Sequence, residues 1–262
     1  MSDWNPASYG RFAGLRLRPA IDLLAHVPRD LPQGAIVDLG CGNGAVGPAL
    51  AEAWPKRERI GIDTSATMLC EAEEAGTYTR LTRDDIADWQ PDGPAALIFS
   101  NAALHWLPDH AGLIARLAGS LAPGGVLAVQ MPRQFGAPSH RFLREFAAEM
   151  FPDRFDFAGW RAPVMTPVEY LRLLAPLGQA NVWETDYIQR LGPAPDGHPV
   201  RRFTEATAMR PFLARLSEAE TEAFLARYEA ALGSAYPVEA DGGVLFPFRR
   251  LFFTLRREGY NA

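Results

Sequence analysis

Closely spaced glycines after a short apolar run are the first residues in this chain suited to ligand chemistry. The run is Ile36-Val37-Asp38-Leu39, and Gly40, Gly42 and Gly44 follow it. Glycines let the backbone approach a ligand closely, and the change from an apolar run to a helical pattern predicts a strand, a tight turn and a helix. Asp63 ends the next predicted strand, where an acid commonly meets a ribose. We therefore expect a nucleoside cofactor at this turn.

The charge beside the glycine turn indicates which cofactor it holds. Gly42, Gly44 and Gly47 fit the GxGxxG pattern of dinucleotide sites, in which backbone N–H groups receive a pyrophosphate. Asp38 stands two residues before the first glycine, and its carboxylate would suit a cation far better than a phosphate. S-adenosylmethionine (SAM) has a cationic amino-acid tail and no phosphate. The sequence thus favours SAM over NAD, with Asp63 accepting hydrogen bonds from the ribose hydroxyls.

Later segments supply further candidate contacts to the cofactor. In the acidic turn after residue 81, we expect Asp85 to accept a hydrogen bond from the adenine amino group and the Ile86 N–H to meet a ring nitrogen. Asp84 and Asp88 are interpreted as solvated turn charges. Met68 fits either an adenine contact or a core position. The predicted cofactor-binding residues are Asp38, Gly40, Cys41, Gly42, Asp63, Thr64, Met68, Asp85, Ile86, Asn101 and Trp106.

Alternating strand and helix patterns through residue 131 predict an α/β fold with a parallel sheet and right-handed crossovers. The expected strands are 35–39, 59–62, a short strand from 81, 95–100 and 126–131, and the expected helices are 45–54, 66–75 and 109–121. A turn at 123–125 should precede the fifth strand. Beyond residue 131 we expect helices at 139–150, 167–177, 199–209 and 218–232, and strands at 181–190 and 248–256.

This pattern suggests three parts: an N-terminal helical cover at 1–30, a cofactor-binding core at 31–134, and a remainder at 135–262 with helical insertions that form a lid over the substrate. In the first part, Trp4, Tyr9, Arg16 and Arg18 are either ordinary packing residues or a cover over the cofactor.

Composition points to a cytoplasmic protein that binds a small molecule. The 26 basic and 31 acidic residues give a net charge of −5, which does not favour nucleic acid or an anionic membrane. The two cysteines lack metal-ligand spacing, so we expect no metal. No export signal or long apolar run is present. We expect a monomer.

Two sets of motifs carry resemblances to known families. The broader set is 38–44, Asp63, Asp85-Ile86 and 121–125, and the narrower set is 1–6, 101–110, 126–132, Arg210-Pro211 and 250–252. The broader set resembles the motifs of the class I, Rossmann-like methyltransferases. The narrower set extends over most of the chain and resembles the trans-aconitate 2-methyltransferase family; it implies transfer of the SAM methyl group to a carboxylate of trans-aconitate, giving a monomethyl ester and S-adenosylhomocysteine. Where that family often has a polar amide before Trp106, this chain has His105.

That resemblance implies chemistry based on positioning. A carboxylate is already ionised near neutral pH, so no catalytic acid or base is required, and arginine forks would hold the remaining carboxylates. His105 is interpreted as a hydrogen-bond donor or, alternatively, as a general base, which would imply a phenol, amine or carbon acid as acceptor. The alternatives left open are another small acceptor, such as a phenol, a quinone or a carrier-bound acid, and a non-catalytic SAM sensor. The predicted substrate-binding residues are Tyr9, His105, Gln130, Arg133, Tyr187, Arg210 and Arg250.

Overall fold

The computed structural model describes residues 17–205 and 208–259, which form two compact units. The sheet unit comprises the described residues within Met1–Pro132, Pro163–Thr185 and Arg250–Ala262; the helical unit comprises those within Arg133–Ala162 and Asp186–Arg249. Both helical insertions thus fall in one unit. Trp4, Tyr9 and Arg16 lie outside the described residues, so the cover at 1–30, like the lid, stays a prediction.

A seven-stranded sheet with the order β3-β2-β1-β4-β5-β7-β6 is the framework of the sheet unit. The strands β1 to β5 pair in parallel, which confirms the parallel sheet expected through residue 131. The strand β7 runs antiparallel to β5 and places Arg250 opposite Pro132. The strands are β1 Ile36–Leu39, β2 Arg59–Asp63, β3 Arg80–Arg83, β4 Ala95–Asn101, β5 Leu121–Pro132, β6 Gly178–Leu191 and β7 Val244–Arg257.

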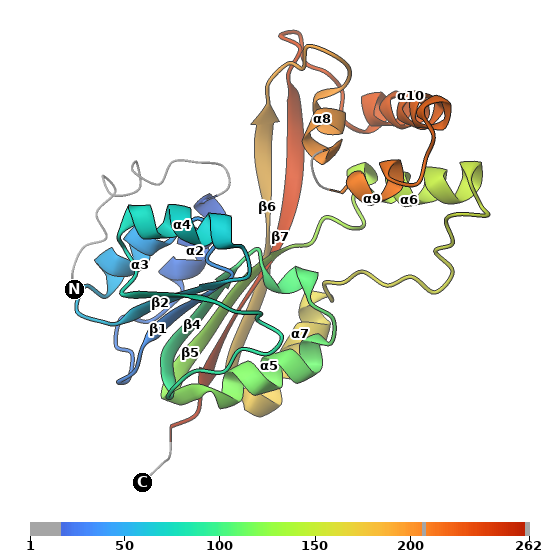
Figure 1. Ribbon diagram of the computed structural model, residues 1–262. Helices are drawn as coiled ribbons and strands as arrows, with labels where there is room; N and C mark the ends of the chain where they lie inside the picture. The colour runs from blue at the N-terminus through green and yellow to red at the C-terminus, as the bar shows by residue number, and fades with distance from the viewer. Residues whose placement is uncertain (1–16, 206–207, 260–262) are drawn as a thin grey trace. The chain divides into compact units, whose positions relative to one another are not determined.

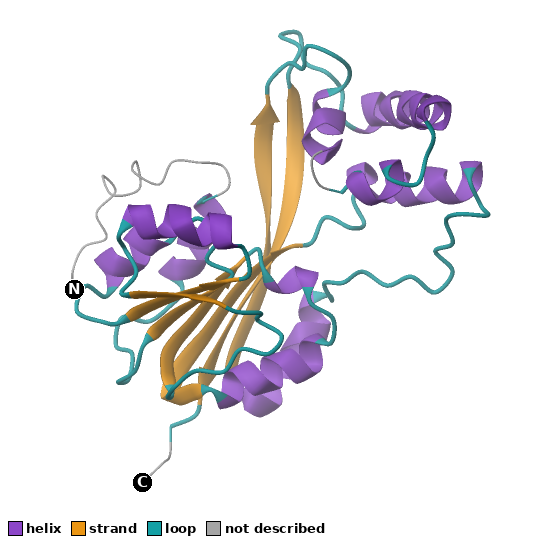
Figure 2. Ribbon diagram, viewed as in Figure 1, coloured by secondary structure: helices purple, strands orange, loops and turns teal. Residues whose placement is uncertain are grey.

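Helices cover both faces of this sheet. Figures 1 and 2 show α2, α3 and α4 on one face and α5 and α7 on the other. The helix α4 begins as predicted, because the Ser65 side chain accepts a hydrogen bond from the Met68 N–H (3.3 Å). The helices are α2 Arg18–Ala25, α3 Gly47–Ala53, α4 Ala66–Ala75, α5 His110–Gly119 and α7 Pro167–Leu174, with short 3₁₀ helices at Leu104–Trp106 and Ala175–Leu177.

The prediction of a turn at 123–125 is wrong, because these residues lie inside β5. Proline and two glycines signal a turn in sequence, but here they accommodate an irregularity in the strand. Gly124 has a φ of 80°, and the β4–β5 register shifts between Ala95 and Leu97. The chain therefore bends without leaving the sheet.

The helical unit has a core of its own, rich in aromatic rings. The helices α6 (Pro138–Met150) and α10 (Glu218–Ala235) pack together, and Phe224, Tyr228 and Phe246 are fully buried in this core. The predicted helix at 199–209 corresponds to α8 (Pro199–Glu205), which the undescribed residues 206–207 follow, and α9 (Arg210–Leu213) begins after Met209. Among the helices of the described residues, none is long and apolar enough to cross a membrane.

Candidate cofactor and substrate site

The glycine turn is held against the end of β2 by its own backbone. The N–H groups of Gly40 and Cys41 both donate to the Ile62 carbonyl, at 2.8 and 3.0 Å. Gly40 has a φ of 75°, and a Cβ atom there would lie 2.3 Å from the Ala103 Cβ, so only glycine fits. At Gly42, by contrast, a Cβ atom would meet nothing within 4 Å. The turn is therefore packed against protein at Gly40 and open at Gly42.

Asp38 is a buried carboxylate directly before this turn. It is 1% exposed, and the Tyr78 hydroxyl donates a 2.6 Å hydrogen bond to its Oδ2. Burial raises the pKa of Asp38 to about 7; the Tyr78 hydrogen bond opposes this rise, and the neighbouring charge of Asp63 adds to it. No basic side chain of residues 17–205 and 208–259 forms an ion pair with Asp38. A cationic ligand would offset the cost of this buried charge.

Asp63 joins two backbone segments of the site. Its Oδ2 accepts from the Gly42 N–H and its Oδ1 from the Ser65 N–H, both at 2.9 Å. The carboxylate is partly exposed, so it keeps acceptor capacity for a ligand. The same side chain therefore fixes the turn and could bind ribose hydroxyls, and only the second role follows from the sequence pattern.

Four further predicted cofactor contacts follow β2 and β3 in the chain. Asp85 is exposed and accepts from the Ala87 N–H (2.9 Å), whereas Ile86 is buried against the glycine turn. Thr64 is exposed, and its carbonyl accepts from Arg83 Nε (2.9 Å). Met68 is 43% exposed, which excludes the core position considered above. Contact of these residues with adenine stays a prediction.

Three polar side chains at or just after the ends of β4 and β5 each have a buried atom without a hydrogen-bond partner among the described residues. These atoms are Asn101 Oδ1, His105 Nδ1 and Gln130 Nε2. Asn101 pairs with Gln130 across the two strands, and the buried Arg250 donates to Gln130 Oε1 (3.4 Å). An unsatisfied buried polar group costs about 1–3 kcal/mol. Such a cluster at the carboxyl ends of parallel strands is typical of a ligand site.

His105 is neutral in this environment. Burial, followed by the positive charge of Arg250 and the nearby His110, lowers the pKa of His105 to about 4. Its imidazole therefore offers one donor and one acceptor at neutral pH. A base with so low a pKa removes protons poorly near pH 7, which favours the hydrogen-bonding role over the general base.

The structure describes four further predicted site residues. Trp106 is 78% exposed, with its ring centroid 4.6 Å from that of His105. Arg133, Tyr187 and Arg210 belong to the helical unit. There, Arg133 lines a cavity of about 390 Å³, Tyr187 is buried and Arg210 is exposed. Their role in substrate binding stays a prediction, as does that of Tyr9, which is not described.

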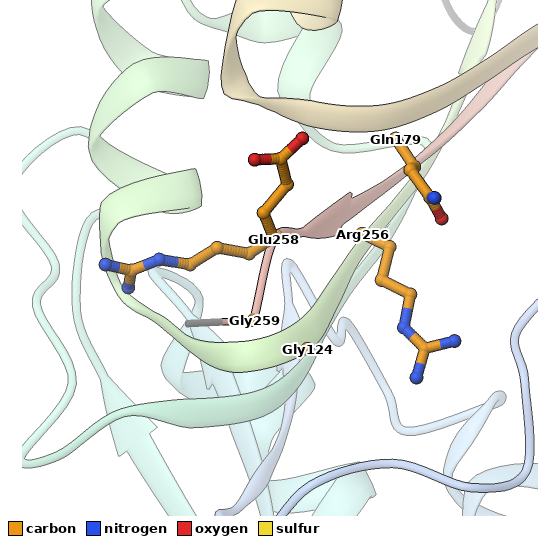
Figure 3. Close-up of a pocket in the computed structure, with 6 residues that line it drawn as sticks. Gly124, Gln179, Arg256, Glu258 and Gly259 are labelled. Atoms are coloured by element: carbon orange, nitrogen blue, oxygen red, sulfur yellow. The ribbon is translucent and has the colours of Figure 1, made fainter. Parts of the chain in front are cut away.

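A cavity of about 480 Å³ elsewhere in the sheet unit lacks a comparable cluster of converging polar side chains. Figure 3 shows that the Arg256 and Glu258 side chains point away from each other around Gly124. Arg257, which also lines it, donates to the Gly119 carbonyl (3.0 Å). Within the described ranges, no three His, Cys, Asp or Glu side chains are placed to hold a metal ion.

Comparison with known proteins decides the family. A methyltransferase-domain model matches residues 36–125. A trans-aconitate 2-methyltransferase of Methylobacterium nodulans is 45% identical, over 98% of this chain and 99% of that protein. The chain belongs to the trans-aconitate 2-methyltransferase family. Relatives with that name from Azoarcus sp. (43% identical, 98% of this chain and 100% of the relative) and Escherichia coli (40%, 98% and 99%) agree.

Solved structures support the fold of the family member described here. The YcgJ protein from Bacillus subtilis matches with a TM-score of 0.57 and 14% identity, over 91% of this chain and 98% of that one. Phosphoethanolamine N-methyltransferase 2 of Haemonchus contortus, solved in complex with SAM, matches with a TM-score of 0.53 and 15% identity, over 97% of this chain and 56% of that one. The Rossmann-like fold of class I methyltransferases, expected from the motifs, is confirmed.

Proposed function

We propose that this chain is a SAM-dependent O-methyltransferase that converts trans-aconitate to a monomethyl ester and releases S-adenosylhomocysteine. The observation that carries the proposal is the identity of 45% over nearly the whole length to a protein with that activity in its name. The clustering of Asn101, His105, Gln130 and Arg250 in one unit supports a site of the matching chemistry.

The residues around the glycine turn fit SAM better than a dinucleotide. Asp38 offers a buried negative charge to an ammonium group. Asp63 offers acceptor oxygens to ribose hydroxyls. The open space at Gly42 allows a ligand to approach the backbone. A pyrophosphate beside Asp38 and Asp63 would instead be repelled.

The polar cluster fits an anionic acceptor. Arg250 supplies a positive charge, Gln130 Nε2 a donor, and His105 a second donor if its proton lies on Nδ1. Because a carboxylate near pH 7 is ionised, these side chains need only hold one oxygen in line with the methyl group. Such orientation can lower the barrier by roughly 7–11 kcal/mol at best.

When bound, SAM supplies a methyl group on a positively charged sulfur. The chain keeps acidic groups (Asp38 and Asp63) at the cofactor end of the site and neutral or basic groups (Gln130 and Arg250) at the acceptor end. We propose that Arg133, Tyr187 and Arg210 add further contacts to the carboxylates. We also propose that the enzyme is a cytoplasmic monomer without nucleic-acid or membrane partners, in keeping with its net charge of −5.

An S-adenosylhomocysteine-release assay over a panel of acceptors tests the proposal. We expect turnover with trans-aconitate, much less with related di- and tricarboxylates, and none with monocarboxylates, because each missing carboxylate leaves a cation or donor unpaired. Turnover of phenols or quinones in place of polycarboxylates would refute the substrate. SAM binding without turnover of any acceptor would refute the enzymatic role in favour of a sensor.

A further inference from the structure

Tyr78 lies in the short link between α4 and β3, and its ring fills the space beneath the glycine turn. Cβ atoms at Gly44, Gly47 and Gly61 would lie 3.2, 3.0 and 3.3 Å from atoms of this ring. Glycine at each of these positions therefore leaves room for the ring. This close packing brings the Tyr78 hydroxyl to the Asp38 carboxylate from below the turn.

The hydroxyl makes a single, well-placed hydrogen bond. It donates to Asp38 Oδ2 at 2.6 Å, and no other hydrogen bond reaches this carboxylate from the described residues. Burial raises the pKa of the Tyr78 phenol, and the charge of Asp38 is the next largest cause of this rise. The phenol therefore keeps its proton and acts as a donor. A phenol held in this way fixes the direction in which Asp38 presents its second oxygen.

We propose that Tyr78 is a positioning residue for cofactor binding, whose hydroxyl orients Asp38 toward the amino group of SAM and stabilises its ionised form. The inference rests on the proposed function, because it assigns the amino group of SAM to Asp38. No motif of the sequence singles out Tyr78.

The surroundings of Asp38 make the Tyr78 hydrogen bond necessary for keeping its carboxyl group ionised. Burial and the neighbouring Asp63 both favour the protonated carboxyl group, and the Tyr78 hydrogen bond alone acts against them. The Cys41 thiol, which is also close, has its pKa raised by burial and by both aspartates. It therefore stays uncharged and gives no compensation. Without the Tyr78 hydroxyl, Asp38 would hold its proton to higher pH.

The test compares SAM dissociation constants of wild type and Tyr78→Phe by calorimetry between about pH 6 and pH 8.5. The phenylalanine ring still fills the space under the glycines, so the fold is kept. For an increase of one unit in the Asp38 pKa, the mutant to wild-type Kd ratio should be about tenfold at pH 6 and less than twofold at pH 8.5. Titration of the SAM amino group, near pH 8, affects both proteins equally and cancels in this ratio.

Two further variants separate positioning from simple damage. Tyr228→Phe removes another buried tyrosine hydroxyl, which donates to the Ser139 carbonyl (2.6 Å) in the helical unit, and it should leave the Kd unchanged at every pH. In an Asp38→Asn background, adding Tyr78→Phe should produce no pH-dependent change. A Kd ratio that stays constant with pH would overturn this inference alone. Absence of SAM binding by the wild type would overturn the proposed function as well.

Discussion

Replacing Asp63 by asparagine should lower the free energy of unfolding of the protein even without a ligand. Each carboxylate oxygen of Asp63 accepts a backbone N–H, from Gly42 on one side and Ser65 on the other. An asparagine side chain has one acceptor oxygen and one NH₂ group. Whichever way the amide is turned, one of the two N–H groups then faces another donor.

The magnitude follows from that one lost partner. A partly buried donor left unsatisfied costs about 1–3 kcal/mol of unfolding free energy. In a protein of this size this corresponds to a fall in Tm of roughly 2–12 °C. SAM affinity should fall too, because the turn is loosened and a ribose acceptor is lost.

Urea or thermal unfolding of the ligand-free variant measures the first effect, and calorimetry with SAM measures the second. Asp92→Asn is the matched control: Asp92 is 79% exposed and pairs with Arg80 on the surface, where such a pair contributes little to stability. If Asp63→Asn unfolds at the same urea concentration or temperature as wild type, the two backbone hydrogen bonds do not hold the turn. If only SAM affinity falls, the carboxylate acts on the ligand alone.

Two further substitutions test the acceptor end. His105→Gln should keep substantial turnover, because an amide can donate as the neutral imidazole does; a collapse of kcat with unchanged KM for trans-aconitate would instead indicate a general base. Arg250→Lys should raise the KM for trans-aconitate and leave the Kd for SAM nearly constant, since lysine keeps the charge but loses the planar fork that also reaches Gln130; steady-state kinetics with an unaltered KM would place Arg250 outside the substrate site.

Local patterns account for the parts of the fold that sequence reasoning predicted well. The strand before Gly40, the Ser65 cap of α4 and the buried run of β4 each depend on neighbours within a few residues. The error at 123–125 has the same origin: Pro-Gly-Gly signals a turn locally, and only pairing with β4 shows that the strand continues through it. Local signals alone cannot reveal that outcome.

The site depends more on contacts between distant segments, which sequence patterns do not reveal. Tyr78 and Asp38 are 40 residues apart, and Asp63 and Gly42 are 21 apart. Gln130 and Arg250, which are 120 positions apart, come together because β7 pairs with β5. Motif reasoning selected Asp38, Asp63, Gln130 and Arg250 by residue type and place, but it could not assign the Tyr78 hydroxyl or the two N–H groups on Asp63.

The strand order itself separates the charges that the proposed reaction needs. Along β2-β1-β4-β5-β7, the site residues are Asp63, Asp38, Asn101, Gln130 and Arg250, so acidic side chains give way to neutral amides and then to a cation. A cationic methyl donor is favoured at the acidic end, and a polycarboxylate is repelled from it. The strands β4 and β5 lie between the two charged ends, and their amides Asn101 and Gln130 can contact either ligand without favouring one sign. We therefore expect methyl transfer to take place over the ends of β4 and β5, the two strands of the five that bring no charge to the site.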